Sequence, residues 1–279
     1  MSNQLKTGIF LGLLTGLILI FGQLMGGSLG LVLAFLLAIG MNVGSYWFSD
    51  RLVLKMYGAK KVDRSEAPVL HEIVEELSQR AGIPKPGVYI IPEKSPNAFA
   101  TGRNPQNGVV GVTEGILQAL SKEELKGVLA HELGHIRNRD ILVQTVAATL
   151  AGVVMFVSSM IRWAAIFGMG GDDEGGHPIV AILLAIVAPL AALIIQMAIS
   201  RSREYLADEA GAQIAGDPRF LASALEKMEA YSKKAPMKTA NESTAHMFIV
   251  NPLKGKSLAK LFSTHPPIEE RITRLRAMS

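Results

Sequence analysis

The chain of 279 residues carries the pentapeptide His131-Glu132-Leu133-Gly134-His135, and this stretch decides how the rest of the sequence is interpreted. Upstream of it, Ser121-Lys122-Glu123-Glu124 has the capping-box pattern that begins a helix. Residues four apart project from one face of a helix, with about 5–6 Å between their Cβ atoms, so the two histidines are placed to bind one metal ion. A zinc hydrolase typically uses three protein ligands and keeps a fourth position for water, so the pattern requires a third ligand elsewhere in the chain.

Glu132 is the candidate general base, because a carboxylate next to a metal ligand can reach the attacking water and take its proton. The alternative is a helix that carries two surface histidines and no metal. Gly127, Ala130 and Gly134 argue against it, since small residues let another segment approach this helix closely. The chain has no cysteine, so only His, Asp and Glu are available as ligands for a transition metal.

The composition is typical of a membrane protein. Hydrophobic residues make up 49% of the chain and the mean hydropathy is +0.30, which does not match a soluble average. The net charge of +4 is small and few aromatic residues are interleaved with the basic ones, so we expect no nucleic-acid partner. Membrane spans and a lipid bilayer as partner are therefore expected.

Four apolar stretches predict two transmembrane hairpins. No charged residue lies between Lys6 and Asp50, and the apolar run is interrupted only around Gly26-Gly27-Ser28, so each half suffices for a helix that crosses a ~30 Å hydrocarbon core. Residues 141–161 and 178–200 predict the second hairpin. A cleavable signal peptide is the alternative for the first stretch, but its apolar core would be only ~7–15 residues long. Buried core helices are the alternative for the others.

Charge next to the predicted spans indicates their orientation. By the positive-inside rule, the side with more Lys and Arg faces the cytoplasm, so both termini and the polar segments are expected there. The basic residues on that side are Lys6, Arg51, Lys55, Lys60, Lys61, Lys122, Lys126, Arg137, Arg139, Arg201 and Arg203, whereas the opposite side carries Arg162, Asp172, Asp173 and Glu174.

The predicted fold class is a mainly α membrane protein with four transmembrane helices and a cytoplasmic α+β catalytic part that contains a small β-sheet. Residues 1–50 and 141–200 are the hairpins, and residues 51–140 and 201–279 form the catalytic part. Periodicity and turn residues predict a helix over 68–81, strands over 87–91, 97–101 and 108–112, a helix over about 113–120, the motif helix from Ser121, and helices that begin near Pro218 and Pro267.

Glu204 and Asp208, one helical turn apart after the fourth span, are candidates for the third ligand and for a group behind a ligand. A carboxylate can hydrogen-bond the second nitrogen of a ligating histidine and fix its tautomer. Spacing alone also fits a solvated pair of acidic residues. If the motif helix continues unbroken from His135 into residues 141–161, the metal lies about 9 Å from the hydrocarbon boundary. The charged residues around the motif distinguish this arrangement from an intramembrane metalloprotease.

Four stretches together resemble the HtpX family of bacterial membrane zinc endopeptidases, relatives of the CAAX prenyl proteases, over essentially the whole chain. The resemblance implies a zincin-like catalytic domain with one Zn²⁺ per chain, His131, His135 and Glu204 as ligands, Glu132 as general base and Asp208 as the group behind a ligand. The four stretches are His131-Glu132-Leu133-Gly134-His135-Ile136-Arg137-Asn138-Arg139-Asp140, Ser202-Arg203-Glu204 to Ala207-Asp208, Asn97-Ala98-Phe99-Ala100-Thr101-Gly102 and Thr264-His265-Pro266-Pro267.

The same resemblance suggests how substrate is held. An extended substrate would add to an exposed edge strand through its backbone, a common mode of peptide recognition. His265 would stabilise the oxyanion of the transition state, and ordering the turn before the last helix is the alternative for it. The strand residues implied are Asn97, Ala98, Phe99 and Ala100.

The activity that the resemblance implies is that of a hydrolase, a zinc metalloprotease with a role in stress response. It would cleave unfolded or misfolded membrane proteins at the cytoplasmic face of the bacterial inner membrane, as a multi-pass protein with its termini and active site in the cytoplasm. One alternative is a catalytically silent membrane scaffold or adaptor, against which the intact Glu132 argues. Another is a protease that processes lipidated C-termini.

Overall fold

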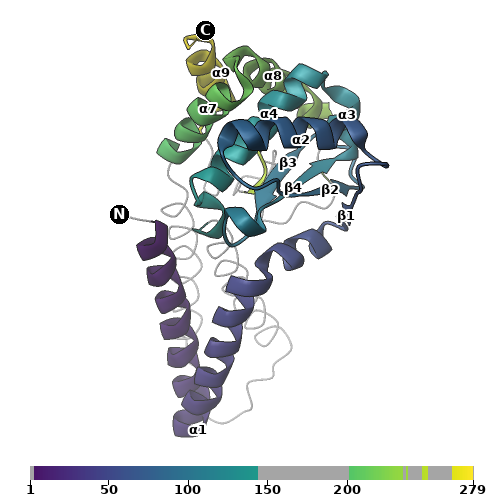
Figure 1. Cartoon of the computed structure of the whole chain (residues 1–279). Coiled ribbons are helices and arrows are strands. Elements are labelled where there is room, and N and C mark those ends of the chain that lie inside the picture. Colours follow the sequence, from purple (N-terminus) through teal and green to yellow (C-terminus); the bar gives the residue numbers. More distant parts are fainter. Residues whose placement is uncertain (1–2, 144–200, 235–236, 238–246, 251–265, 279) are drawn as a thin grey trace.

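The computed structural model describes residues 3–143, 201–234, 237, 247–250 and 266–278 (Figure 1). Most of the third predicted span, all of the fourth, the acidic loop between them and His265 therefore lie outside the described residues.

Helix α1 (Asn3–Met56) folds back on itself at Gly26 and Gly27, so that its two arms lie side by side (Figure 1). Gly27 has φ 55° and ψ −138°, a conformation that only glycine adopts readily. The side chain of Asn42 donates a 2.7 Å hydrogen bond to Thr15 Oγ1 across the hairpin. Within the described part of the chain, one helical stretch, Gly26–Gly44, is long and apolar enough to cross a membrane. The structure thus contains the first predicted hairpin with one candidate span.

A four-stranded sheet forms the centre of the polar part, in the order β1-β2-β4-β3. Strand β2 pairs parallel with β4, whereas β1 pairs with β2 and β3 pairs with β4 in antiparallel register. The outermost strand on one side is therefore β3, which contains most of the predicted substrate strand. The strands are β1 (Lys60–Lys61), β2 (Gly87–Ile91), β3 (Ala98–Thr101) and β4 (Val109–Thr113).

Alternate residues of the strands enter two separate cores, as the two-residue repeat of a strand requires. Ala98 and Ala100 of β3 pack into the larger core with α2 (Pro68–Ala81) and α4 (Lys122–Arg137). Phe99 faces the other way, into a smaller core that includes Tyr57, the residue that follows α1. The sheet is therefore covered by helices on one face and by the end of the hairpin on the other.

Helix ends follow the chemistry that the sequence predicts. The hydroxyl of Ser121 accepts from the backbone N–H of Glu124, and the Glu124 side chain accepts from the Ser121 N–H, so the capping box that begins α4 is confirmed. Helix α2 ends at Gly82, which has φ 67°. The remaining helices are α3 (Glu114–Ala119), α7 (Arg201–Ala215), α8 (Pro218–Lys234) and α9 (Ile268–Arg276).

Small residues bring α4 close to α7 and α8, as predicted. A Cβ atom added to Gly127 would lie 2.4 Å from the backbone nitrogen of Leu221 in α8. One added to Gly211 of α7 would lie 2.9 Å from the Cα atom of His131. Contacts this short exclude any larger side chain without a shift of the backbone, so the helix that carries the histidines and the helix that carries Glu204 are in direct backbone contact.

The motif helix does not continue unbroken from His135 into the third predicted span, so the condition set for the distance of the metal from the hydrocarbon boundary is not met. Helix α4 ends at Arg137, and Arg139 adopts φ 58°, a left-handed conformation that interrupts the helix before a new helical turn begins at Asp140. A non-glycine residue rarely takes this conformation, and neither Gly nor Pro marks the break in the sequence. Its consequence is that the carboxylate of Asp140 turns back towards His135.

Candidate metal centre

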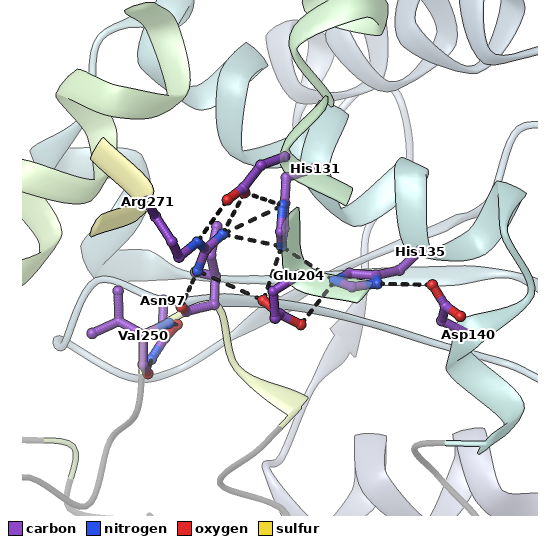
Figure 2. Close-up of polar contacts among 9 residues, drawn as sticks. Asn97, His131, His135, Asp140, Glu204, Val250 and Arg271 are labelled. Atoms are coloured by element: carbon purple, nitrogen blue, oxygen red, sulfur yellow. Dashed lines mark hydrogen bonds and ion pairs between the residues drawn. The ribbon is translucent and has the colours of Figure 1, made fainter. Parts of the chain in front are cut away.

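His131 and His135 of α4 and Glu204 of α7 form a buried cluster that could hold a metal ion (Figure 2). Their side chains are 1%, 6% and 0% exposed. One ligand atom of each lies within 4.8 Å of the others. The structure thus brings together the two histidines of the motif and the acidic residue on the returning chain.

The donor atoms have the spacing that a tetrahedral zinc site needs. The two Nε2 atoms are 3.2 Å apart, His135 Nε2 is 3.4 Å from Glu204 Oε1, and His131 Nε2 is 3.8 Å from Glu204 Oε2. Ligands at about 2.0–2.1 Å from one tetrahedral ion lie roughly 3.3 Å from each other. Two imidazoles and one carboxylate also leave the open position of a catalytic zinc site, so these residues fit the metal.

Behind His131 lies a tight chain of charged groups. The Nδ1 atom of His131 is 2.9 Å from Asp208 Oδ1. Arg271 of α9 donates to both oxygens of Asp208, from Nη2 at 2.7 Å and from Nε at 3.0 Å. All three side chains are almost fully buried. Asp208 therefore lies where the sequence predicts a group behind a ligand.

A second, looser chain of the same kind lies behind His135. Its Nδ1 atom is 3.5 Å from Asp140 Oδ2, and Asp140 Oδ1 is 3.7 Å from the guanidinium of Arg203. Arg271 and Asp140 flank the cluster from opposite sides (Figure 2). The Nδ1 atom of each motif histidine thus faces a carboxylate, and that carboxylate in turn contacts an arginine.

The two histidines differ in their proton affinity. Burial lowers the pKa of His131 to about 4, although its hydrogen bond to Asp208 favours the charged form. Burial acts in the same direction on His135, but Asp140, Glu204 and Glu132 outweigh it and raise its pKa to about 9. At neutral pH His131 is therefore free to coordinate a metal, whereas a metal must displace a proton from His135.

Glu132 is 2% exposed and lies within the same group of charges. Its carboxylate raises the pKa of His135 and that of Arg271, so its charge acts on both sides of the ligand cluster. The predicted base thus belongs to the buried site.

Arg271, Asp140 and Arg203 are parts of the site that the sequence does not predict. Arg271 carries a recognisable signal, because it shares the apolar stripe of α9 with Ile268 and Leu275, where a charged residue needs a partner. The role of Asp140 depends on the break at Arg139, which no turn residue announces. Arg203 stands next to Glu204, and its contact with Asp140 joins two segments far apart in the sequence.

The predicted substrate strand does not present a free edge at its first residues. Asn97, just before β3, donates from Nδ2 to the carbonyl of Val250 at 2.8 Å and accepts from the Val250 N–H at 3.3 Å (Figure 2). The carbonyl of Ala98 accepts from the N–H of Ile249 at 3.2 Å. A segment of the chain itself therefore lies against the strand where the sequence predicts a substrate.

Known proteins are similar to this chain over its whole length. The sequence profile of peptidase family M48 matches residues 64–279. A protein of Syntrophobacter fumaroxidans named protease HtpX homolog is 56% identical over 282 residues, which cover 100% of both chains. Proteins with the same name from Desulfatibacillum aliphaticivorans and Pyrococcus furiosus are 58% and 55% identical; the matches cover 99% and 98% of this chain and 89% and 95% of those relatives.

The fold is also similar to that of a solved structure. The crystal structure of S. mikatae Ste24p matches with a TM-score of 0.53 and 19% sequence identity over 95% of this chain. The match spans 62% of the Ste24p chain. At this identity the likeness concerns the fold alone.

Proposed function

The chain belongs to the HtpX proteases of peptidase family M48, and from this membership we propose that it is a zinc-dependent endopeptidase that cleaves unfolded or misfolded membrane proteins. It is a membrane-associated metalloprotease. We propose in addition that the metal is zinc, which residues bind it and which class of substrate is cleaved. Quality control of membrane proteins is the role that this substrate class implies.

The observation that carries the proposal is the triangle of donor atoms. His131, His135 and Glu204 offer two nitrogens and one oxygen at the separations of a tetrahedral zinc site, and all three side chains are buried. We propose these three residues as the zinc ligands. Behind them, Asp208 orients His131 and fixes the tautomer that presents Nε2 to the metal.

The reaction is peptide hydrolysis, and its proton transfers fall to Glu132. Zinc, when bound, supplies a Lewis acid that polarises the scissile carbonyl and acidifies a water molecule. Glu132 takes the proton of the attacking water and returns it to the nitrogen of the leaving amine. We assign His265 to the oxyanion of the transition state and Asn97, Ala98, Phe99 and Ala100 to the substrate backbone, both by resemblance to the family.

We further propose four membrane spans and a cytoplasmic active site in the bacterial inner membrane. The exposed apolar side chains of the second arm of α1, among them Leu29, Leu33 and Leu36, are suited to contact with lipid. The basic residues next to the predicted spans favour the cytoplasmic orientation.

Substituting Glu132 tests the function. In purified full-length protein, Glu132→Gln is expected to keep one zinc per chain and to lose about 10²–10⁴-fold in kcat on an unfolded model polypeptide, since the amide cannot accept the proton. Metal analysis and the rate of peptide-bond cleavage measure the two effects. Glu123→Gln, the same substitution on the exposed face of α4, is the matched control and should leave both unchanged. Undiminished cleavage by Glu132→Gln would remove the proposed mechanism.

A further inference from the structure

The dipeptide Ile249-Val250 has all of its backbone polar groups bonded to residues beside the metal cluster. The N–H of Ile249 donates to the carbonyl of Ala98 at 3.2 Å, and the Ile249 carbonyl accepts from Arg271 Nη1 at 3.3 Å. The N–H and carbonyl of Val250 both bond to the carboxamide of Asn97. Two N–H donors and two carbonyl acceptors are thus matched, which is what a site for an extended peptide backbone provides.

This peptide site adjoins the metal cluster through one side chain. Arg271 Nη2 lies 3.4 Å from the imidazole nitrogens of His131, and Nη1 lies 3.7 Å from Glu204 Oε2. The same guanidinium that holds the Ile249 carbonyl therefore touches two of the proposed ligands. A polypeptide seated on Asn97, Ala98 and Arg271 lies next to the catalytic centre.

Ile249 bonds to the edge of β3 that faces away from β4. Strand β3 pairs with β4 on one side, and in an antiparallel pair alternate residues direct their N–H and carbonyl groups away from the partner. The carbonyl of Asn97 accepts from the N–H of Thr113 in β4, so the outward groups belong to Ala98 and Ala100. Ile249 takes the carbonyl of Ala98, the first acceptor that an added strand would use.

Phe248 anchors the dipeptide in the smaller core. Its ring contacts Tyr57 and Phe99 edge to face, with centroid distances of 4.9 Å and 5.4 Å. The side chains of Phe248, Ile249 and Val250 are fully buried, Phe248 in the smaller core and the other two in the larger one. An apolar tripeptide thus fills three side-chain positions around the edge of β3.

We propose that Phe248-Ile249-Val250 occupies the substrate site as an intramolecular pseudosubstrate, and that the site takes extended polypeptides with an aromatic residue followed by two branched apolar residues. The inference rests on the proposed function, because it names the regulation and the side-chain preference of that same site. Substrate and tripeptide compete for Asn97, Ala98 and Arg271. Sequences of this composition are buried in folded proteins and exposed in unfolded ones, which matches an enzyme for damaged membrane proteins.

Competition within the chain has a kinetic signature. A site that is free for only a fraction of the time shows an apparent KM raised by the inverse of that fraction, while kcat is unaffected once substrate is seated. Loosening the anchor is therefore expected to lower KM alone. Phe248→Leu keeps an apolar side chain in the smaller core and removes the two edge-to-face contacts.

The experiment compares wild-type, Phe248→Leu and Phe220→Leu proteins, all full-length and zinc-loaded. Phe220 lies against the larger core in α8, so Phe220→Leu applies the same change away from the site. We expect Phe248→Leu to lower KM for an unfolded model polypeptide about fivefold at constant kcat, and Phe220→Leu to leave KM unchanged. A fall in kcat or in the melting temperature with KM unchanged would show that the tripeptide only completes the fold, and would overturn the proposal.

A binding measurement separates this inference from the proposed chemistry. A fluorescent peptide with the sequence Met-Phe-Ile-Val, as in residues 247–250, is titrated into Glu132→Gln protein with and without Phe248→Leu. We expect about fivefold tighter binding with Phe248→Leu, whether or not the enzyme cleaves peptides. The same peptide should inhibit the unaltered enzyme competitively, which needs no variant of the tripeptide. Absence of both binding and inhibition would overturn the pseudosubstrate while leaving the zinc peptidase intact.

Discussion

The two histidines of the motif are supported by the same sequence of groups, a carboxylate and then an arginine, but with different tightness. Behind His131, the contacts to Asp208 and from there to Arg271 are 2.9 Å and 2.7 Å. Behind His135, the contacts to Asp140 and from there to Arg203 are 3.5 Å and 3.7 Å. One side of the metal site is held by short charge-assisted hydrogen bonds, and the other is held by longer electrostatic contacts.

The origin of the difference is the backbone that carries each carboxylate. Asp208 lies within α7, which is in backbone contact with α4, and Arg271 reaches it from α9. Asp140 follows the left-handed residue Arg139, where the chain leaves α4. Groups on packed helices are positioned to within hydrogen-bond geometry, whereas a group that follows a helix break has a less constrained position.

The pKa values of Arg271 and Arg203 show the same difference between the two sides of the metal site. Burial acts to lower the pKa of both guanidinium groups. At Arg271 the carboxylates of Asp208, Glu204 and Glu132 outweigh burial and raise the pKa above its ordinary value. At Arg203 burial dominates and the pKa is lowered, although Asp140 and Glu204 favour the charge. The contrast predicts that the His131 side is essential to the fold and that the His135 side is more tolerant.

The largest effect is expected when the arginines are removed. Arg271→Met leaves the buried carboxylate of Asp208 without its bidentate partner, which should destabilise the protein by about 3–5 kcal/mol. Arg203→Met removes a longer contact and a desolvated charge, and should cost about 1 kcal/mol. Denaturant unfolding of the metal-free proteins measures both. Arg276→Met, on the exposed side of α9, is the control and should change stability by less than about 0.5 kcal/mol. Equal losses of unfolding free energy in Arg271→Met and Arg203→Met would contradict the proposed difference between the two sides.

A smaller effect is expected on metal affinity when the carboxylates lose their charge. Asp208→Asn should weaken zinc binding about 10–100-fold, because the second nitrogen of His131 then lacks its anionic acceptor. Asp140→Asn should weaken it less than about tenfold, since its contact to His135 is already long. Competition with a chelator gives both dissociation constants, and Asp217→Asn, at the start of α8 and outside the metal cluster, is the control. A larger loss from Asp140→Asn would reverse the assignment of the tight side.

The three proposed ligands and Asp208 are the more predictable part of the site, and the reason is local regularity. The two histidines share a helix that begins with a capping box, and Asp208 lies one turn after Glu204 on another, so periodicity and family resemblance place all four. Helix α2 and the strands are likewise predicted from local signals, such as the glycine at position 82, which ends α2 and has φ 67°. When residues lie in a regular helix or strand, their spacing along the chain determines their relative positions in space.

The remaining parts of the site depend on contacts between distant segments. Arg271 reaches Asp208 across 63 positions of sequence, and Val250 reaches Asn97 across 153. The position of Asp140 depends on a left-handed residue that no glycine or proline announces. Such pairings are decided by packing of whole elements, which periodicity within one element does not specify.

The smallest expected effect is on stability in acid. It tests the charge of Arg271 on the His131 side and leaves the three proposed ligands unchanged. Burial by itself would raise the pKa of Asp208, but the charge of Arg271 and the hydrogen bond to His131 outweigh it and hold the pKa below the ordinary value of 3.8. A carboxyl with a lowered pKa stabilises the fold fully above 3.8, and this contribution is lost as the pH falls through the lower, folded-state pKa.

In Arg271→Met, burial is less opposed and the pKa of Asp208 rises, so the folded state takes up this proton as readily as the unfolded chain and the acid-dependent loss becomes smaller. We expect the metal-free variant to lose about 1 kcal/mol less than the wild type between pH 5 and pH 3, so that part of its deficit at neutral pH disappears in acid. Arg203→Met keeps Asp208 and Arg271 paired and should follow the wild-type pH dependence. Unfolding free energies measured across this pH range test the difference. Parallel curves for all three proteins would mean that Arg271 contributes packing to the His131 side and not charge.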